Sequence, residues 1–358
     1  MKICIILGTR PEIIKMSPVI RELQSRKIDF FILHTNQHYS AGMDQLFFDE
    51  LHLPQPKYNL DVHDFYHGAM VGKMLIGIEP ILQQEKPDWV LVEGDTNTVL
   101  AGALSASKLG IKVGHVEAGL RSYDRTMPEE LNRIVADHLA DALFCPTDTS
   151  VKIAIGEGIP KDKVFMTSNT IVDAVEHNLK LAQKSPFAKK YKDQEYFLLT
   201  MHRPSNVDTK LALSQAVASL ESLVDALSVP IIFPVHPRTF AALKRFALIP
   251  NPAKIKLIEP VGYLEMLLMM ESAKLIITDS GGIQEEACIM HVPCITIRDN
   301  TERPETVTAG ANLVVGTTPH KVLTGAKNML EKPRIWSNPF GDGSTSIKIV
   351  EILTSTKQ

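Results

Sequence analysis

The residues best suited to chemistry are concentrated in one short stretch, residues 275–287. An apolar, β-branched run ends there in Asp279, Ser280, Gly281 and Gly282, and a helical pattern begins at once. Two adjacent glycines at the end of a strand let the backbone approach a ligand closely. The free N–H groups at the start of the helix, together with the helix dipole, suit an anion and most often a phosphate. This stretch therefore predicts a phosphate site.

Two carboxylates, Glu285 and Glu286, follow in what we expect to be the first turn of that helix. A carboxylate beside a phosphate would repel it, so we expect one of the two to accept hydrogen bonds from ribose hydroxyl groups. The competing interpretation is that both only complement the helix dipole. We favour the nucleotide interpretation.

Apolar strands alternate with longer amphipathic stretches along the whole chain, which indicates an α/β fold with parallel sheets and helical crossovers. At 358 residues the chain is too long for one typical core, so we expect two domains with a linker near residues 168–170. Helices are expected at 13–24, 68–85, 98–108, 128–140 and 147–156. Strands are expected at 2–8, 30–35, 89–93, 112–117, 142–145 and 164–167, and in the second half at 196–201, 230–234, 255–258, 275–278, 293–297 and 311–315.

Composition excludes several classes of protein. The net charge of −3, from 38 basic and 41 acidic residues, leaves no general electrostatic footprint for nucleic acid. No apolar run approaches the ~20 residues that span a bilayer, so we expect no membrane partner. The cysteines show no Cys-x-x-Cys spacing and read as reduced core thiols of a cytoplasmic protein. They are Cys4, Cys145, Cys288 and Cys294.

Open α/β sheets bind ligands at the carboxyl ends of their strands, in a cleft that we expect between the two domains. Arg10 and Lys15 follow the first strand, where both cations could reach an anion. Asp95 follows the third strand and suits a helix N-cap, although it would still project into the cleft. Glu117 ends the fourth strand, where a structural residue is normally apolar, so we expect it to take part in chemistry.

Further candidates follow the next elements along the chain. Glu129 and Arg133 are four residues apart on a predicted helix, so they share a face and suit an ion pair. In the second half, His202, His236 and Arg303 each follow a predicted strand. No Gly-x-Gly-x-x-Gly follows the first strand, so no nicotinamide cofactor is expected. The spaced histidine pairs lack a third ligand, so no metal site is expected.

Six motifs in the same order resemble the non-hydrolysing UDP-N-acetylglucosamine 2-epimerases, and the match covers nearly the whole chain. They are residues 8–15, 94–96, 115–121, 128–133, 278–287 and 298–305. The resemblance implies a GT-B-like fold of two Rossmann-like domains, 1–168 and 169–338, facing a central cleft. It also implies a C-terminal segment, 339–358, whose helix crosses back to the first domain, and a homodimer.

The family inverts C2 of UDP-N-acetylglucosamine to give UDP-N-acetylmannosamine, a precursor of surface polysaccharides, without a cofactor. UDP leaves by elimination, giving a 2-acetamidoglucal, and then adds back with C2 protonated on the opposite face. The resemblance assigns the acid/base groups to Asp95, Glu117 and Glu129. It adds His202, which faces the leaving diphosphate, to the catalytic residues. It assigns substrate binding to Arg10, Lys15, Arg133, Tyr263, Ser280, Gly281, Gly282, Glu286 and Arg303, with Glu286 on the ribose and Tyr263 beside the uracil.

The chain departs from the family after the first strand of the second domain. Bacterial members often carry His-Arg-Arg-Glu-Asn there, whereas this chain has Pro204 and Ser205 in place of the Arg-Glu pair. In some relatives that second arginine helps hold an extra substrate molecule as an allosteric activator, beside residues matching Gln37, His38, Gln45 and His236. We therefore expect substrate activation to be weakened or built differently here.

Three alternatives share the nucleotide site. A GT-B glycosyltransferase would need an acceptor and would not invert C2. An epimerase of a UDP-diacetamido-uronic acid would differ in its N-terminal motifs. A nucleotide-sugar sensor without catalysis would not require the three carboxylates Asp95, Glu117 and Glu129.

Overall fold

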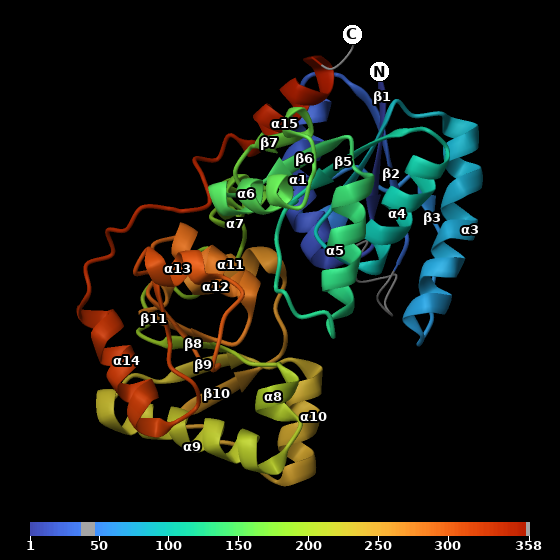
Figure 1. Cartoon of the computed structure of the whole chain (residues 1–358). Coiled ribbons are helices and arrows are strands. Elements are labelled where there is room, and N and C mark those ends of the chain that lie inside the picture. Colours follow the sequence, from blue (N-terminus) through green and yellow to red (C-terminus); the bar gives the residue numbers. More distant parts are fainter. Residues whose placement is uncertain (37–46, 356–358) are drawn as a thin grey trace. The chain divides into compact units, whose positions relative to one another are not determined.

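The computed structural model describes residues 1–36 and 47–355, which divide into two compact units (Figure 1). Unit 1 consists of Met1–Glu176 and Phe340–Gln358, and unit 2 consists of His177–Pro339. The division falls within helix α7, Thr170–Ala182. The domain boundary after residue 168 stays a prediction.

Unit 1 is built on a parallel sheet that has seven strands within the described residues, in the order β3-β2-β1-β4-β5-β6-β7. Buried β-branched and apolar residues form these strands because both faces of a parallel sheet are covered by helices. The strands are β1 Lys2–Leu7, β2 Asp29–His34, β3 Tyr58–Asn59, β4 Trp89–Glu93, β5 Lys112–Val116, β6 Ala142–Cys145 and β7 Val164–Met166.

The helices of unit 1 pack in layers on this sheet. Helix α4 contacts both α3 and α5, and their apolar side chains cover one face of the sheet (Figure 1). Helix α1 packs instead against α15, the last helix of the chain. The helices are α1 Arg10–Ser25, α3 His67–Glu85, α4 Asn97–Lys108, α5 Pro128–Leu139, α6 Asp148–Gly156 and α15 Thr345–Ser355, with a short 3₁₀ helix at Lys161–Lys163.

Unit 2 has a six-stranded parallel sheet in the order β10-β9-β8-β11-β12-β13. Residues 197 and 199 of β8 join the core beneath α9 and α14, and residue 198 joins the core beneath α11 on the other face. The strands are β8 Phe197–Thr200, β9 Ile231–Pro234, β10 Ile255–Ile258, β11 Leu275–Thr278, β12 Cys294–Thr296 and β13 Asn312–Val314. The helices are α8 Pro204–Val207, α9 Lys210–Leu227, α10 Pro237–Phe246, α11 Tyr263–Ser272, α12 Gly281–Ile289, α13 Pro304–Thr308 and α14 Pro319–Glu331.

The strand order of each sheet reverses at one point. In unit 1 the reversal lies between β1 and β4, and in unit 2 it lies between β8 and β11. Connections leave such a pair of strands toward opposite faces of the sheet, so a crevice forms at their carboxyl ends. The loops at these points carry Asp95, His202 and Ser280, and helix α1, which follows β1, carries Lys15; the sequence singled out all four.

The C-terminal segment belongs to unit 1, as predicted. Asp173, in the first turn of α7, accepts hydrogen bonds from the backbone N–H groups of Thr345 and Ser346, at 3.3 and 2.9 Å, and from the Ser346 hydroxyl at 2.7 Å. These bonds satisfy free N–H groups at the start of α15. The carboxylate therefore anchors the returning helix.

The α/β prediction is confirmed, and every predicted strand matches an observed one to within one residue at each end. Helix α1 starts three residues earlier than predicted, because Glu12 caps the backbone at Gly8 and Thr9. The two-residue strand β3 was not predicted. Within residues 1–36 and 47–355, no helix is long and apolar enough to cross a bilayer.

Candidate active site

The centre of the site in unit 1 is Lys15, which lies between two carboxylates. Its ammonium group forms a close ion pair with Glu117 and lies 3.4 Å from Oε1 of Glu93. Helix α1 supplies the lysine, and the carboxyl ends of β4 and β5 supply the two glutamates. All three side chains are nearly buried. One cation thus faces two carboxylates in a region shielded from water.

The backbone at Glu117 adopts a conformation that few side chains accept. Its φ is +65°, in the left-handed region, and Gly119 follows with a φ of +76°. A non-glycine residue pays about 1–3 kcal/mol for such a conformation and keeps it only where the surroundings enforce it. The turn therefore holds Glu117 in a defined direction at the end of β5.

Glu93 is a proton-holding group that the sequence analysis did not single out. Burial raises the pKa of Glu93 well above its usual range; Lys15 lowers it in part, and the neighbouring Glu117 raises it further. Desolvation and a like charge both disfavour the ionised carboxyl group. The Lys15 cluster, which we define as Lys15, Glu93 and Glu117, therefore retains a proton at pH values where an exposed glutamate is ionised.

Glu12 is a second buried carboxyl group near this cluster. It accepts hydrogen bonds from the backbone N–H groups of Gly8 and Thr9, at 2.5 and 2.8 Å, and a further close one from the Thr96 hydroxyl. Burial raises the pKa of Glu12 to about 7 despite these bonds. Glu12 thus ties the turn after β1 to the turn after β4.

Asp95 projects from the turn after β4 and pairs with Arg133 of α5. The predicted N-cap role of Asp95 is wrong, because the neighbouring Thr96 caps α4 through its hydroxyl. Arg133 also donates to Glu130 at 2.9 Å, and Glu130 is the residue three positions before it. In the described residues, Arg133 does not form the predicted ion pair with Glu129, which lies in the first turn of α5.

Unit 2 has its own organising carboxylate, Asp279, which is fully buried at the end of β11. It accepts hydrogen bonds from the backbone N–H groups of His202 and Arg203 and from the side chain of Asn206, at 2.8–3.1 Å. Burial lowers the pKa of His202, although Asp279 opposes that shift. Asp279 therefore joins the loop after β8 to the turn that starts α12.

The turn after β11 presents the N-terminus of α12, as predicted. Ser280 is the N-cap residue, and Gly281 and Gly282 begin the helix. A Cβ atom placed on Gly282 would meet no neighbouring atom within 4 Å, so internal packing does not require glycine there. Gly282 is exposed at the start of the helix, where the free N–H groups and the helix dipole suit an anion.

The two carboxylates of α12 lie in its second turn rather than in the first, because the helix begins at Gly281. Glu286 accepts a hydrogen bond of 2.9 Å from the hydroxyl group of Tyr263, at the start of α11. Glu285 forms an ion pair of 2.6 Å with Arg303. Three of the predicted substrate-binding residues, Tyr263, Glu286 and Arg303, thus lie around the start of α12.

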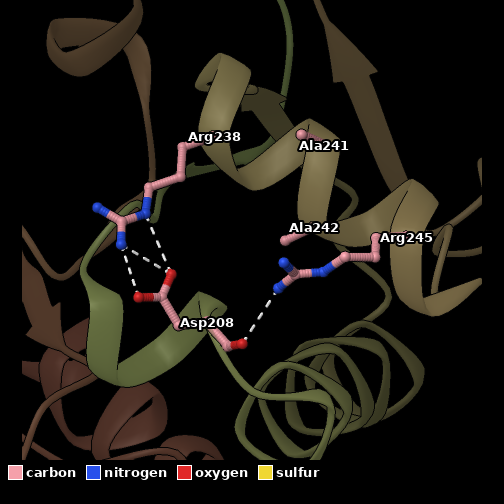
Figure 2. A pocket seen from close by; sticks show the side chains of 5 residues that line it. All are labelled: Asp208, Arg238, Ala241, Ala242 and Arg245. Carbon is pink, nitrogen blue, oxygen red and sulfur yellow. Dashed lines mark hydrogen bonds and ion pairs between the residues drawn. The ribbon is translucent and has the colours of Figure 1, made fainter.

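A cavity of about 500 Å³ lies in unit 2 beside α10 (Figure 2). Arg238 donates to both carboxylate oxygens of Asp208, at 2.6–3.1 Å, and Arg245 donates to its backbone carbonyl at 3.2 Å. The arginine groups are thus directed at Asp208. None of the predicted site residues lines this cavity, so we do not assign it to the active site.

The remaining candidates are distributed as follows. Arg10 lies over the ring of Phe47, with 5.0 Å between the guanidinium carbon and the ring centroid. His236 caps α10, and its ring centroid lies 5.6 Å from that of His202. Gln37, His38 and Gln45 lie outside the described residues, so the substrate-activation site stays a prediction.

Comparison with known proteins finds similar chains over nearly the whole length of this one. A family model described as UDP-N-acetylglucosamine 2-epimerase matches residues 21–354. A UDP-N-acetylglucosamine 2-epimerase of Methanocaldococcus jannaschii is 55% identical over 365 aligned positions, with 100% of both chains covered. A crystal structure of the M. jannaschii enzyme in complex with UDP-GlcNAc and UDP superimposes with a TM-score of 0.91, covering 99% of this chain and 100% of that one.

A more distant relative differs in its substrate. The UDP-2,3-diacetamido-2,3-dideoxy-D-glucuronate 2-epimerase of Pseudomonas aeruginosa is 40% identical, with 99% of both chains covered.

The raised pKa of Glu12 predicts a pH-dependent stability. Its pKa is about 7 in the folded protein, against 4.5 for an ordinary glutamate. The unfolded chain therefore releases this proton first, so the contribution to stability is complete below pH ~4.5 and is lost as the pH rises to ~7. Glu12→Gln keeps the shape of the group and removes its titration. Relative to wild type, the variant should gain about 2 kcal/mol of unfolding free energy between pH 5 and pH 7.

Urea unfolding at pH 5 and pH 7 measures this difference. The matched control is Glu79→Gln, which alters an exposed carboxylate of α3. Equal pH dependence in wild type and Glu12→Gln would show that folded Glu12 does not hold its proton.

Proposed function

Because this chain belongs to the UDP-N-acetylglucosamine 2-epimerase family, we propose that it interconverts UDP-N-acetylglucosamine and UDP-N-acetylmannosamine. The observation that carries the proposal is the Lys15 cluster at the switch point of unit 1. Binding a nucleotide sugar does not require a buried pair of carboxyl groups in which the pKa of Glu93 is raised, whereas moving the proton of a carbon atom calls for such groups.

The chemistry we propose is elimination followed by re-addition. A base takes the proton from C2, and the electron pair of the C2–H bond forms the C1=C2 double bond. The C1–O bond breaks, and UDP leaves with the electron pair of that bond. The 2-acetamidoglucal then takes a proton at C2 on the opposite face, and UDP re-forms its bond to C1. Proton removal and delivery on opposite faces requires at least two acid/base groups.

Unit 1 supplies the groups for proton transfer in this proposal. Glu117, Asp95 and Glu129 are the acid/base residues. Lys15 compensates the charge of Glu117, and Arg133 orients Asp95 through their ion pair. An electrostatic environment that is already in place when charge develops is the main source of catalytic stabilisation in many enzymes.

Unit 2 binds the UDP group in this proposal. The N–H groups at Ser280, Gly281 and Gly282 receive the diphosphate, together with His202 and Arg303. Glu286 accepts hydrogen bonds from the ribose, and its bond to Tyr263 holds it in place. The resemblance assigns Tyr263 to the uracil wall.

A UDP-diacetamido-uronic acid is the second candidate substrate, because a 40% identical relative carries that name. The greater identity to the N-acetylglucosamine enzyme favours UDP-N-acetylglucosamine. Proton NMR with each substrate in turn decides between them: the preferred substrate gives its C2 epimer with the higher kcat/KM.

We also propose a cytoplasmic location, because all four cysteines are buried free thiols, as expected in a reducing compartment. Such a location suits an enzyme that supplies nucleotide sugars for surface polysaccharides.

The acid/base assignment predicts a separation of turnover from binding. Glu117→Gln and Asp95→Asn keep the size of each side chain but remove its ability to take up a proton. Each should lower kcat by at least about a hundredfold, while the affinity for UDP, measured by calorimetry, stays within about threefold of wild type. The matched control is Glu79→Gln on α3. Near-normal turnover in both variants would remove the assignment.

We propose a homodimer whose interface includes exposed apolar side chains before and along α3. Phe65, Tyr66 and Ile76 are 83%, 72% and 76% exposed, and a second copy of the chain would cover them. Replacing Phe65 and Tyr66 together by serine should halve the mass measured by sedimentation. Ile335→Ser is the control, since Ile335 is 82% exposed in unit 2. An unchanged mass in the double variant would exclude this surface as the interface.

A further inference from the structure

A second buried ionic group lies behind the catalytic turns of unit 1. It consists of His115 near the end of β5, Asp137 on α5 and Arg121 after β5. Their side chains are 0–1% exposed. The proposed chemistry assigns none of them a role, although burying charged groups is expensive unless they are paired.

His115 is bonded through both ring nitrogens. Nδ1 lies 2.7 Å from a carboxylate oxygen of Asp137, and Nε2 lies 2.8 Å from the backbone carbonyl of Gly94. A carbonyl oxygen can only accept, and an ionised carboxylate can only accept, so both ring nitrogens donate. His115 is therefore an imidazolium. Burial alone would lower the pKa of His115, but Asp137 raises it, and the net shift is upward.

Asp137 connects this cation to the second turn. Its oxygens accept from the backbone N–H of Gly119 at 3.1 and 3.3 Å, and one of them also accepts from Arg121 at 2.7 Å. Arg121 in turn pairs with Glu157, at the end of α6. The positive charges of His115 and Arg121 are thus compensated by the negative charges of Asp137 and Glu157.

The two backbone atoms held by this group belong to the turns that carry the proposed acid/base residues. Gly94 directly precedes Asp95, and Gly119 lies two residues after Glu117. Both glycines have positive φ, +82° and +76°. At Gly119 a Cβ atom would lie 2.4 Å from the carbonyl oxygen of Ser150, so this turn is closely packed as well.

We propose that His115 and Asp137 are positioning residues for epimerisation: together they hold the Gly94 and Gly119 turns, and thereby set the separation of Asp95 and Glu117. The proposal rests on the proposed function. It adds to that function the residues that align two proton-transfer groups, which must act on one carbon atom. A displacement of about 1 Å at a reacting group can lower the rate by about a hundredfold.

Replacement of His115 tests the proposal. His115→Phe fills the site but loses both hydrogen bonds, and His115→Gln retains one amide donor. We expect kcat to fall by at least about a hundredfold in the Phe variant and by about tenfold in the Gln variant. The KM for UDP-N-acetylglucosamine and the affinity for UDP should stay within about threefold of wild type.

The control and the outcomes are defined as follows. His138→Phe changes the exposed residue that follows Asp137 on α5 and should leave kcat unchanged. Rates are expressed per UDP-binding site counted by calorimetry, so that a loss of folded protein does not count as a loss of turnover. If His115→Phe binds no UDP because it fails to fold, His115→Gln decides.

A purely structural ion pair would leave kcat per binding site within about twofold of wild type in the deciding variant, and this result would overturn the proposal. An increase in KM alone would also overturn it. Absence of epimerisation in the wild-type protein, measured in the same assay, would instead overturn the proposed function.

Discussion

One lysine makes it possible for two carboxyl groups to lie together at the strand ends of unit 1. Glu93 and Glu117 are both nearly buried, and Lys15 is the cation that lies between them. Burial and the neighbouring Glu117 raise the pKa of Glu93, although Lys15 lowers it in part. The cluster therefore holds a proton that can be exchanged, which is what proton transfer to and from carbon requires.

In each unit, buried carboxylates hold the turns that follow the strands. In unit 1, Glu12 ties the turn after β1 to that after β4, and Asp137 holds the turn after β5. In unit 2, Asp279 performs the corresponding task for the loop after β8. Each unit thus uses buried carboxylates as acceptors for backbone N–H groups, and this fixes the loops at the switch points more firmly than apolar packing alone.

Much of this arrangement could be predicted from the sequence, because strand periodicity shows which residues follow a strand. Glu117 was found in this way. The contact of Lys15 with Glu93 and Glu117 could not be predicted, because it depends on which strands are neighbours in the sheet. Thr96 and Asp95 both suit an N-cap, and the choice between them depends on the contact of Asp95 with Arg133. Glu93 stands at a strand end like Glu117, and the same signal would have found it.

We propose above all that the carboxyl groups Asp95, Glu117 and Glu129 of unit 1 exchange a proton with C2 of the sugar. The most direct measurement is proton NMR of UDP-N-acetylglucosamine incubated with the protein in heavy water. The account predicts that UDP-N-acetylmannosamine forms with deuterium at C2, and that the C2 proton of the remaining UDP-N-acetylglucosamine is replaced as the reaction approaches equilibrium. Epimer formed without deuterium at C2 would contradict the account, because inversion would then proceed without proton exchange.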